Sequence, residues 1–421
     1  MMRFLYGLAW VLAAPLALAR LAWRSRRQSG YLAKVGERFG RYAPAPPGPR
    51  IWIHAVSVGE TRAAAPIVAA LAKRHPRHRI LLTHMTPTGR ATGEALFGDS
   101  VDRAWLPYDM GFAVRRFLRH FRPDLGVILE TEAWPRLIEE SAHAGIPVVI
   151  ANGRLSERSA RRYARVPALA RWAFSGLDGI AAQAEADARR FRSLGAREVA
   201  VTGNVKFDLE VPDAMRERGR ELRSRLGSRP VWVAGSTREG EEALLLDAFA
   251  RRGEEGDALL VIVPRHPQRF DEVARLASAR GFTIARRSDA SPVPRAARVM
   301  LGDSMGEMLA YYAAADVVIM GGSLLPFGGQ NLIEACALAR PVIVGPHTWN
   351  FGEASEGAIA AGAALRVADA DAAIEAAGAL ATDEARSVAM GRAAAQFVAA
   401  HRGAVDRLMD WLAPRLARRA D

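Results

Sequence analysis

The sequence predicts an α/β protein with two doubly wound domains, each built on a parallel sheet covered by helices on both faces. Short β-branched apolar runs alternate with helical stretches from residue 50 to about 205, and the same alternation restarts near residue 231. A polar, helix-prone stretch without clear apolar periodicity (211–229) separates the two series. Parallel strands buried on both faces give such runs. We therefore expect two Rossmann-like domains that face a central cleft.

Each expected strand is a run of apolar, often β-branched residues. In the first domain the runs are IWIHAV (51–56), RILLTHM (79–85), DLGVILE (124–130), IPVVIAN (146–152) and GIAAQ (179–183). In the second they are VWVAG (231–235), LLVIVP (259–264), RVMLG (298–302), VVIMGG (317–322) and PVIVG (341–345). Polar and glycine-rich segments follow most of these runs, so the chemistry is expected at the carboxyl ends of the strands.

Length and composition agree with two domains. The 421 residues exceed what one hydrophobic core usually organises. Half of the residues are hydrophobic and 24% are charged, which excludes a disordered, collagen-like or polytopic membrane protein. The expected divisions are an N-terminal membrane anchor with a basic hinge (1–28), a first domain (29–210) and a second domain (211–421). A final amphipathic helix (393–419) could pack back across both domains.

The charge balance favours an anionic partner. Fifty-eight basic against forty-five acidic side chains give a net charge of +13, which suits nucleic acid, phospholipid headgroups or phosphorylated substrates without choosing among them. Lys34, Lys73 and Lys206 are the only lysines in an arginine-rich chain, so each of them stands out. Cys336 is the single cysteine; it cannot form an internal disulfide and lacks zinc-ligand spacing, which indicates a reducing compartment.

An uncharged apolar run (4–19) predicts a membrane anchor. Its sixteen residues would span about 24 Å as a helix, against about 30 Å of hydrocarbon, so crossing requires a tilt or a snorkelling Arg20. The alternatives are a buried core helix and a cleaved secretory signal, although a signal normally carries its positive charge before the run. One arginine precedes this run and four follow closely, which places the body of the protein on the cytoplasmic side.

The first strand exit carries Ser57, Gly59 and Glu60 at the start of a helix. The Glu60 carboxylate could cap that helix through its dipole, or it could act as a general base toward an acceptor hydroxyl. The sequence alone leaves both roles open.

Two further strand exits in the first domain carry charged side chains. Glu130 and Glu132 follow the third apolar run and would point the same way if strand geometry continued, although pairing with arginines is the competing interpretation. Lys206 lies near the domain boundary, where its ammonium group could stabilise negative charge on a sugar or phosphate, or could be an ordinary surface lysine.

Anion-binding features mark the second domain. Arg265, His266 and Arg269 cluster around two prolines after a strand. Asp303 or Ser304 is expected as a helix N-cap, which would leave the amides of 305–307 free to receive a phosphate; a plain helix start is the alternative.

The richest segment is GGSLLPFGGQNLIEACALARPVIVG (321–345), where a strand leads into a glycine-rich loop and a helix expected to start near Asn331. Glu334, in the first turn of that helix, is placed to accept hydrogen bonds from ribose hydroxyls while loop amides face a phosphate. The unit favours a nucleotide-sugar site. No Walker sequence and no G-x-G-x-x-G follows a strand, and the scattered histidines predict no metal site.

Ten motifs in order resemble those of the bacterial 3-deoxy-D-manno-octulosonic acid (Kdo) transferases. They are HAVSVGE, HMTPTG, LPYD, ETEAWP, IANGRLS, TGNVKFD, PRHPQRF, GDSMGEM, GGSLLPFGGQNLIEA and GPHTWNF. The likeness covers residues 1 to about 355. It implies a GT-B fold, with an acceptor domain followed by a donor domain. It also implies transfer of Kdo from CMP-Kdo to a lipid A precursor in lipopolysaccharide synthesis, without a metal or a cofactor and with inversion at the anomeric carbon.

The resemblance assigns roles to individual positions. Glu60 matches the family's proton acceptor, while Glu130 and Lys206 match residues that stabilise the transition state. The residues that match the CMP-binding motifs are Pro264, Arg265, Met305, Gly306, Glu307, Asn331, Leu332, Ile333 and Glu334. Supporting positions are Ser57, Gly59, Ser236, Thr237, Gly322, Ser323, Gly329 and Gln330.

Two departures from the family pattern lie in the donor loop. Gln330 stands where the family often has histidine, and 325–327 differ from its commonest loop sequence. We expect altered loop detail with the same chemistry. The resemblance implies CMP-Kdo, a lipid A precursor and the anionic inner membrane as partners, and no nucleic acid.

Two rival functions remain at this stage. One is a transferase or epimerase of the same fold that uses a UDP-sugar in envelope precursor synthesis. The other is a membrane-tethered protein that binds anionic lipids without catalysis, which would leave the glycine loop and Glu334 unexplained.

Overall fold

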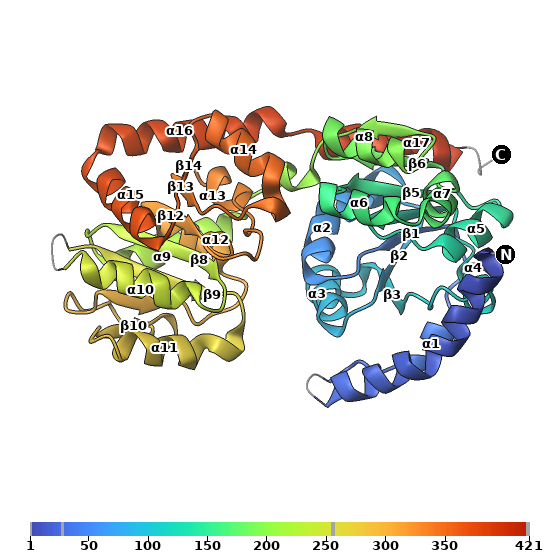
Figure 1. The fold of residues 1–421 in the computed structure, drawn as a ribbon, viewed down its shortest axis with the longest axis horizontal. Helices are drawn as coiled ribbons and strands as arrows, with labels where there is room; N and C mark the ends of the chain where they lie inside the picture. Colours follow the sequence, from blue (N-terminus) through green and yellow to red (C-terminus); the bar gives the residue numbers. More distant parts are fainter. Residues whose placement is uncertain (1, 27–28, 254–256, 418–421) are drawn as a thin grey trace. The chain divides into compact units, whose positions relative to one another are not determined.

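The computed structural model describes residues 2–26, 29–253 and 257–417 (Figure 1). The chain divides into two compact units, one formed by Met1–Asp208 with Gly403–Asp421 and the other by Leu209–Arg402. We call them unit 1 and unit 2. Each contains a seven-stranded parallel sheet, so the predicted fold class of two Rossmann-like domains is confirmed. The chain passes from unit 1 to unit 2 between Asp208 and Leu209, two residues before the boundary expected at 210/211.

The sheet of unit 1 has the strand order β3-β2-β1-β4-β5-β6-β7. Its strands are β1 (Arg50–His54), β2 (Arg79–His84), β3 (Asp102–Trp105), β4 (Leu125–Leu129), β5 (Val148–Gly153), β6 (Gly179–Ala182) and β7 (Val199–Val201). Side chains alternate between the two faces of the sheet: Ile51 and Ile53 pack in one core cluster and Trp52 in another. Both faces are therefore buried.

Helices of unit 1 cover these two faces. They are α2 (Val58–Arg74), α3 (Pro87–Phe97), α4 (Gly111–Phe121), α5 (Pro135–His143), α6 (Glu157–Ala164), α7 (Pro167–Ser175), α8 (Glu185–Ser193) and α17 (Ala404–Ala417). Ile67 of α2 and Leu412 of α17 join the cluster of Ile51. Phe117 of α4 and Phe174 of α7 join the cluster of Trp52.

Unit 2 repeats the plan with the strand order β10-β11-β9-β8-β12-β13-β14. Its strands are β8 (Val231–Thr237), β9 (Leu259–Pro264), β10 (Ile284–Arg286), β11 (Val299–Leu301), β12 (Val317–Met320), β13 (Val342–Val344) and β14 (Ala364–Arg366). Its helices are α9 (Asp213–Leu226), α10 (Glu241–Arg251), α11 (Phe270–Ser278), α12 (Met308–Ala314), α13 (Ile333–Ala337), α14 (Gly352–Ala360), α15 (Ala370–Thr382) and α16 (Glu384–His401).

The four strands that the apolar runs did not predict, β3, β7, β10 and β14, are the edge strands of the two sheets. Each has only three or four residues, and each leaves part of its side chains accessible to solvent. A strand paired on one side needs no continuous apolar run, so the pattern that marks central strands is missing.

The prediction of a single final helix over 393–419 is wrong. The chain forms α16 and α17, separated by Arg402 and by Gly403, which adopts a positive φ of 85°. α16 belongs to unit 2, whereas α17 packs on α2 in unit 1. Asp208 receives hydrogen bonds from the amides of Gly403 (2.6 Å) and Val405 (2.5 Å), which fastens the returning chain.

The apolar N-terminal run forms helix α1 (Met2–Ser25), which contains Pro15. Among the described residues it is the one helix long and apolar enough to cross a membrane. It is therefore a candidate membrane anchor, as the sequence predicts. The anchor and basic hinge expected together over 1–28 extend past the end of α1, and residues 27 and 28 lie outside the described residues.

Candidate active site

Glu60 lies in the first turn of α2, directly after β1. Ser57 is the N-cap of this helix, and the Glu60 carboxylate accepts hydrogen bonds from the Val56 amide (2.7 Å) and the Ser57 hydroxyl (2.9 Å). The carboxylate thus caps the chain that enters the helix. It is still partly accessible to solvent, so the capping role does not exclude a role as base.

The surroundings of Glu60 favour its protonated form. Burial and the nearby charges of Glu130 and Glu132 together raise the pKa of Glu60 to about 7, against the opposing hydrogen bonds from the Val56 amide and the Ser57 hydroxyl. A carboxylate with a pKa near neutrality can both take up and release a proton at physiological pH. This is the property that a general base needs.

Glu130 and Lys206 form an ion pair beside Glu60. The Nζ of Lys206 lies 2.7 Å from Oε1 of Glu130, with both side chains mostly buried. Glu130 follows β4, and Lys206 lies in a short 3-10 helix (Val205–Asp208) that follows β7. The sequence left open a pairing of these acids with arginines; the partner observed for Glu130 is Lys206.

The strand geometry that would carry Glu130 and Glu132 in the same direction does not continue to these residues. β4 ends at Leu129, and Glu130 adopts a left-handed backbone with φ of 60°. A non-glycine residue in that region is held there by its surroundings. Glu132 is half-buried, and burial followed by the charge of Glu130 raises its pKa.

In unit 2 the predicted donor residues gather along one edge of the sheet. β11, β9, β8 and β12 are neighbours in this order. The segments at their carboxyl ends contain Met305–Glu307, Pro264 with Arg265, Ser236 with Thr237, and Gly322 with Ser323. Parallel strands bring these segments to a common edge, which is where open α/β sheets bind ligands.

Glu241 organises this edge, and sequence analysis missed it. The buried carboxylate, in the first turn of α10, accepts hydrogen bonds from the amides of Arg238 (2.8 Å), Gly322 (2.6 Å), Leu324 (3.0 Å) and Leu325 (3.4 Å). It therefore joins the loop after β8 to the glycine-rich loop after β12. An acid in the first turn of a helix after the first strand of a sheet is the signal that identified Glu60, and it was available here too.

The predicted N-cap at Asp303 or Ser304 is wrong. α12 begins at Met308 with Glu307 at the N-cap position. Asp303 accepts hydrogen bonds from the amide (2.9 Å) and hydroxyl (2.7 Å) of Ser288, and the Ser304 hydroxyl donates to Glu307 (2.7 Å). The side chains of Asp303 and Ser304 therefore bond to these partners and do not cap α12. Met305 and Gly306 lie in a bend before the helix.

The helix expected near Asn331 begins slightly later, as α13 at Ile333. The Asn331 side chain accepts a hydrogen bond from the Ile333 amide (3.3 Å) and donates one to Oε1 of Glu334 (3.1 Å). Asn331 therefore bonds both to the start of α13 and to Glu334, and so orients the Glu334 carboxylate. The glycine loop before it is closed by the Gly329 amide, which donates to the Gly322 carbonyl (2.6 Å).

Several predicted residues face the protein interior. Leu332, Ile333 and Ser323 are fully buried. The Ser323 hydroxyl accepts a hydrogen bond from the Gly345 amide (2.8 Å) and donates one to the Met320 carbonyl. Any contact of the two apolar residues with a nucleotide would involve their backbone.

The cluster of basic residues after β9 is only partly available for an anion. Arg269 pairs with Glu242 (2.6 Å) and Glu272 (3.0 Å). Burial lowers the pKa of His266, which is surrounded by arginines. Pro264 and Arg265 remain at the strand end as predicted, and Gln330 lies beside Gly322.

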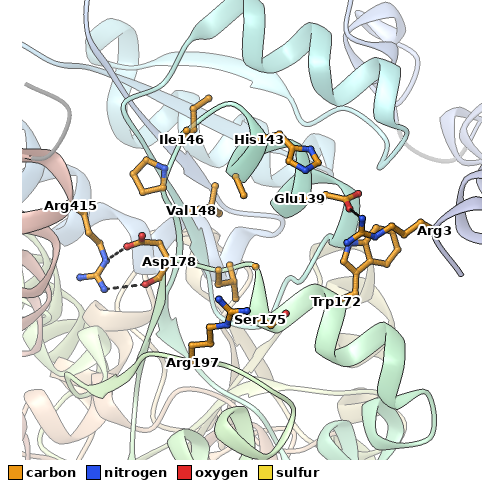
Figure 2. Close-up of a pocket in the computed structure, with 15 residues that line it drawn as sticks. Arg3, Glu139, His143, Ile146, Val148, Trp172, Ser175, Asp178, Arg197 and Arg415 are labelled. Carbon is orange, nitrogen blue, oxygen red and sulfur yellow. Dashed lines mark hydrogen bonds and ion pairs between the residues drawn. The ribbon is translucent and has the colours of Figure 1, made fainter.

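A pocket of about 600 Å³ lies elsewhere in unit 1 and includes none of the predicted site residues (Figure 2). Its walls include Val148 at the start of β5 and Asp178 just before β6, with Arg3, Trp172 and Arg415 around them. The pocket therefore lies at the amino ends of β5 and β6, whereas Glu60 follows the carboxyl end of β1 in the same sheet. Within 2–26, 29–253 and 257–417, no group of three His, Cys, Asp or Glu side chains is placed to hold a metal.

The sequence is similar to known proteins over most of its length. Residues 33–209 match the family model described as 3-deoxy-D-manno-octulosonic-acid transferase (kdotransferase). The chain is 46% identical to the 3-deoxy-D-manno-octulosonic acid transferase of Bordetella pertussis, with 97% of this chain and 99% of that protein covered. It is 38% identical to the transferase of that name from Haemophilus influenzae, over 99% and 100% of the two chains.

A solved glycosyltransferase from Rickettsia africae shares the fold, with a TM-score of 0.60 at 12% identity over 88% of this chain and 98% of that one. The two parallel-sheet domains therefore have a GT-B-like fold, and the named transferases identify the chain as a glycosyltransferase. Since two relatives above 30% identity are covered almost completely, the chain belongs to the 3-deoxy-D-manno-octulosonic acid transferase family.

Proposed function

We propose that the chain transfers Kdo from CMP-Kdo to a lipid A precursor, with inversion and without a metal or cofactor. An acceptor hydroxyl oxygen attacks the anomeric carbon of Kdo from the face opposite CMP. A new carbon–oxygen bond forms while the bond from the anomeric carbon to the phosphate oxygen breaks. The proton of the hydroxyl passes to Glu60, and CMP leaves as a phosphate monoester.

The observation that carries this proposal is the state of Glu60. Two hydrogen bonds hold its carboxylate in one position, and its pKa is about 7. A general base works best when its pKa lies near the operating pH. Family membership makes Kdo transfer the reaction that this base would serve.

The other residues have separate roles in this proposal. Lys206 and Glu130 would orient the acidic sugar and stabilise the oxocarbenium-like centre. Arg265 would stabilise the departing phosphate, aided by the amides of 305–307. Glu334, positioned by Asn331, would accept hydrogen bonds from the ribose hydroxyls. Unit 2 is thus the proposed donor domain and unit 1 the proposed acceptor domain.

The proposed place of action is the cytoplasmic face of the inner membrane. The acceptor is a lipid, the chain carries an apolar N-terminal helix, and its net charge of +13 favours an anionic membrane surface. The partners are therefore the donor nucleotide sugar, the lipid acceptor and the membrane, with no role for nucleic acid.

Mass spectrometry of the products from CMP-Kdo and a tetraacylated lipid A precursor tests donor and acceptor together. We expect lipid ions heavier by one or more Kdo residues, and release of CMP only when both substrates are present. A thermal shift with CMP or UDP tests the nucleotide separately. If UDP stabilises the protein and CMP does not, the donor assignment is wrong.

A further inference from the structure

Helix α1 has two different faces. Tyr6, Trp10, Ala14, Ala17 and Leu21 repeat at intervals of three and four residues, so they share one side of the helix, and all five are partly or fully buried. The opposite side is apolar and exposed: Phe4 and Leu16 each keep 73% of their surface. The exposed apolar face consists of Phe4, Leu5, Leu8, Val11, Leu12 and Leu16.

The first turns of α1 are bound to unit 1 through polar contacts. The Tyr6 hydroxyl donates a hydrogen bond to Oδ2 of Asp109 (2.6 Å). The Asp109 carboxylate also accepts hydrogen bonds from the backbone amides of Arg136 (3.0 Å) and Leu137 (2.7 Å) in α5. Arg3 pairs with Glu139 of α5 at 2.8 Å. The start of the helix is therefore fixed to the start and the middle of α5.

The middle and the end of α1 pack on the same unit. The Trp10 ring stacks on Tyr108 at a centroid distance of 5.6 Å. Leu21 is buried in a cluster with Tyr31, Tyr108 and Met110, and Ala14 and Ala17 pack against that cluster. Contacts with one unit thus extend along the whole helix.

We infer that α1 lies in the plane of the membrane surface, with its exposed apolar face inserted in the lipid, and does not cross the bilayer. Its 24 residues would measure about 36 Å, slightly more than the hydrocarbon thickness of about 30 Å. If the helix crossed, its first turn would lie a full membrane thickness from its last. Unit 1 contacts the start of the helix through charged and polar groups and its end through the cluster of Leu21, so one folded body would have to follow the helix through hydrocarbon, which its polar groups prevent.

Charges beside the apolar face identify the occupant as anionic phospholipid. Arg20, Arg24 and Arg26 are exposed near the end of the helix. Arginines next to an apolar helical face reach phosphate groups while the face enters the acyl region. The inference rests on the membrane association proposed above and specifies its geometry.

Two terminal tags test the path of α1. The same short hydrophilic tag with one cysteine is fused before Met1 or after Asp421 in the full chain, and membrane-impermeant maleimide is applied to spheroplasts and to inside-out vesicles; Cys336 is buried. An in-plane helix leaves both tags on one side, so both react only in inside-out vesicles. Reaction of the N-terminal tag in spheroplasts, with the C-terminal tag protected, would show a spanning helix and overturn the inference.

Flotation with vesicles tests the docking face. The vesicles contain phosphatidylethanolamine and phosphatidylglycerol, or phosphatidylcholine alone. Leu12→Glu/Leu16→Glu is compared with Leu244→Glu/Val388→Glu, which places the same charges on exposed apolar positions of unit 2. We expect at least fivefold less bound protein for the first pair only, and weaker binding of the parent chain to phosphatidylcholine. Equal binding of both variants would overturn the assigned face, whereas a parent chain that binds neither vesicle would contradict the membrane association itself.

Discussion

Glu60 in unit 1 and Glu241 in unit 2 occupy corresponding places in two similar sheets, yet their surroundings differ. Each lies in the first turn of the helix that follows the first strand of its unit along the chain. Glu241 is fully buried and accepts hydrogen bonds from four backbone amides. Glu60 accepts from one amide and one hydroxyl, is partly exposed and lies near two other acids.

This difference shows how one position can serve two purposes. Burial also raises the pKa of Glu241, but four amide donors oppose that shift and commit its carboxylate to the two loops, so the residue stabilises local structure. Two donors hold Glu60 in place but leave it able to exchange a proton with a substrate. The number of fixed donors and the access of solvent distinguish a structural acid from a reactive one, although the sequence signal is similar.

Replacing Glu60 should have the largest effect. Glu60→Gln keeps the size of the side chain and removes the base, so we expect kcat to fall by about 10²- to 10⁴-fold while the affinity for CMP stays unchanged. Steady-state assays and CMP titration measure both values. Glu94→Gln, an exposed acid on α3, is the matched control. A Glu60→Gln variant with near-normal turnover would rule out the role as base.

Removing the cation beside Glu130 should have the next largest effect. Lys206→Met leaves Glu130 without this partner at 2.7 Å, so we expect kcat to fall by about 10²-fold. The uncompensated charge of Glu130 should also move the acidic limb of the kcat–pH profile above the pH of about 7 expected from Glu60. Lys73→Met, at an exposed position of α2, is the control. An unchanged pH profile would contradict electrostatic coupling between the pair and Glu60.

Glu241→Gln should weaken donor binding more moderately. The amide side chain keeps one acceptor oxygen for four donors, which should cost about 1–3 kcal/mol of stability and loosen both loops. We expect roughly tenfold weaker CMP binding by calorimetry at a temperature where the variant is folded. Glu239→Gln, an exposed neighbour, should bind normally. If Glu241→Gln lowers the melting temperature and leaves the Kd for CMP unchanged, the carboxylate supports the fold without organising the site.

The sequence predicts the central strands well, and it also predicts which polar segments follow them, because long apolar runs and the residues directly after them are local signals. It fails where structure depends on distant partners. The edge strands β3, β7, β10 and β14 are paired on one side and lack the signal. The ion pair of Glu130 with Lys206 joins residues 76 positions apart in the chain. Asp303 and Ser304 resemble an N-cap but bind Ser288 and Glu307 instead.

The pH dependence of stability should show the smallest effect. The folded pKa of Glu60 is about 7, above its ordinary value of 4.5, so the folded protein binds more protons than the unfolded chain between these values. The free energy of unfolding therefore decreases as the pH rises through this window. Glu60→Gln removes that loss and should stabilise the protein by about 1–3 kcal/mol at pH 8, with little effect at pH 4.5. Denaturant unfolding at both pH values, with Glu94→Gln as control, measures the difference. An equal effect at both pH values would mean that ionisation of Glu60 does not destabilise the folded protein. Glu60 and Glu241 would then differ only in the number of hydrogen bonds that their carboxylates accept.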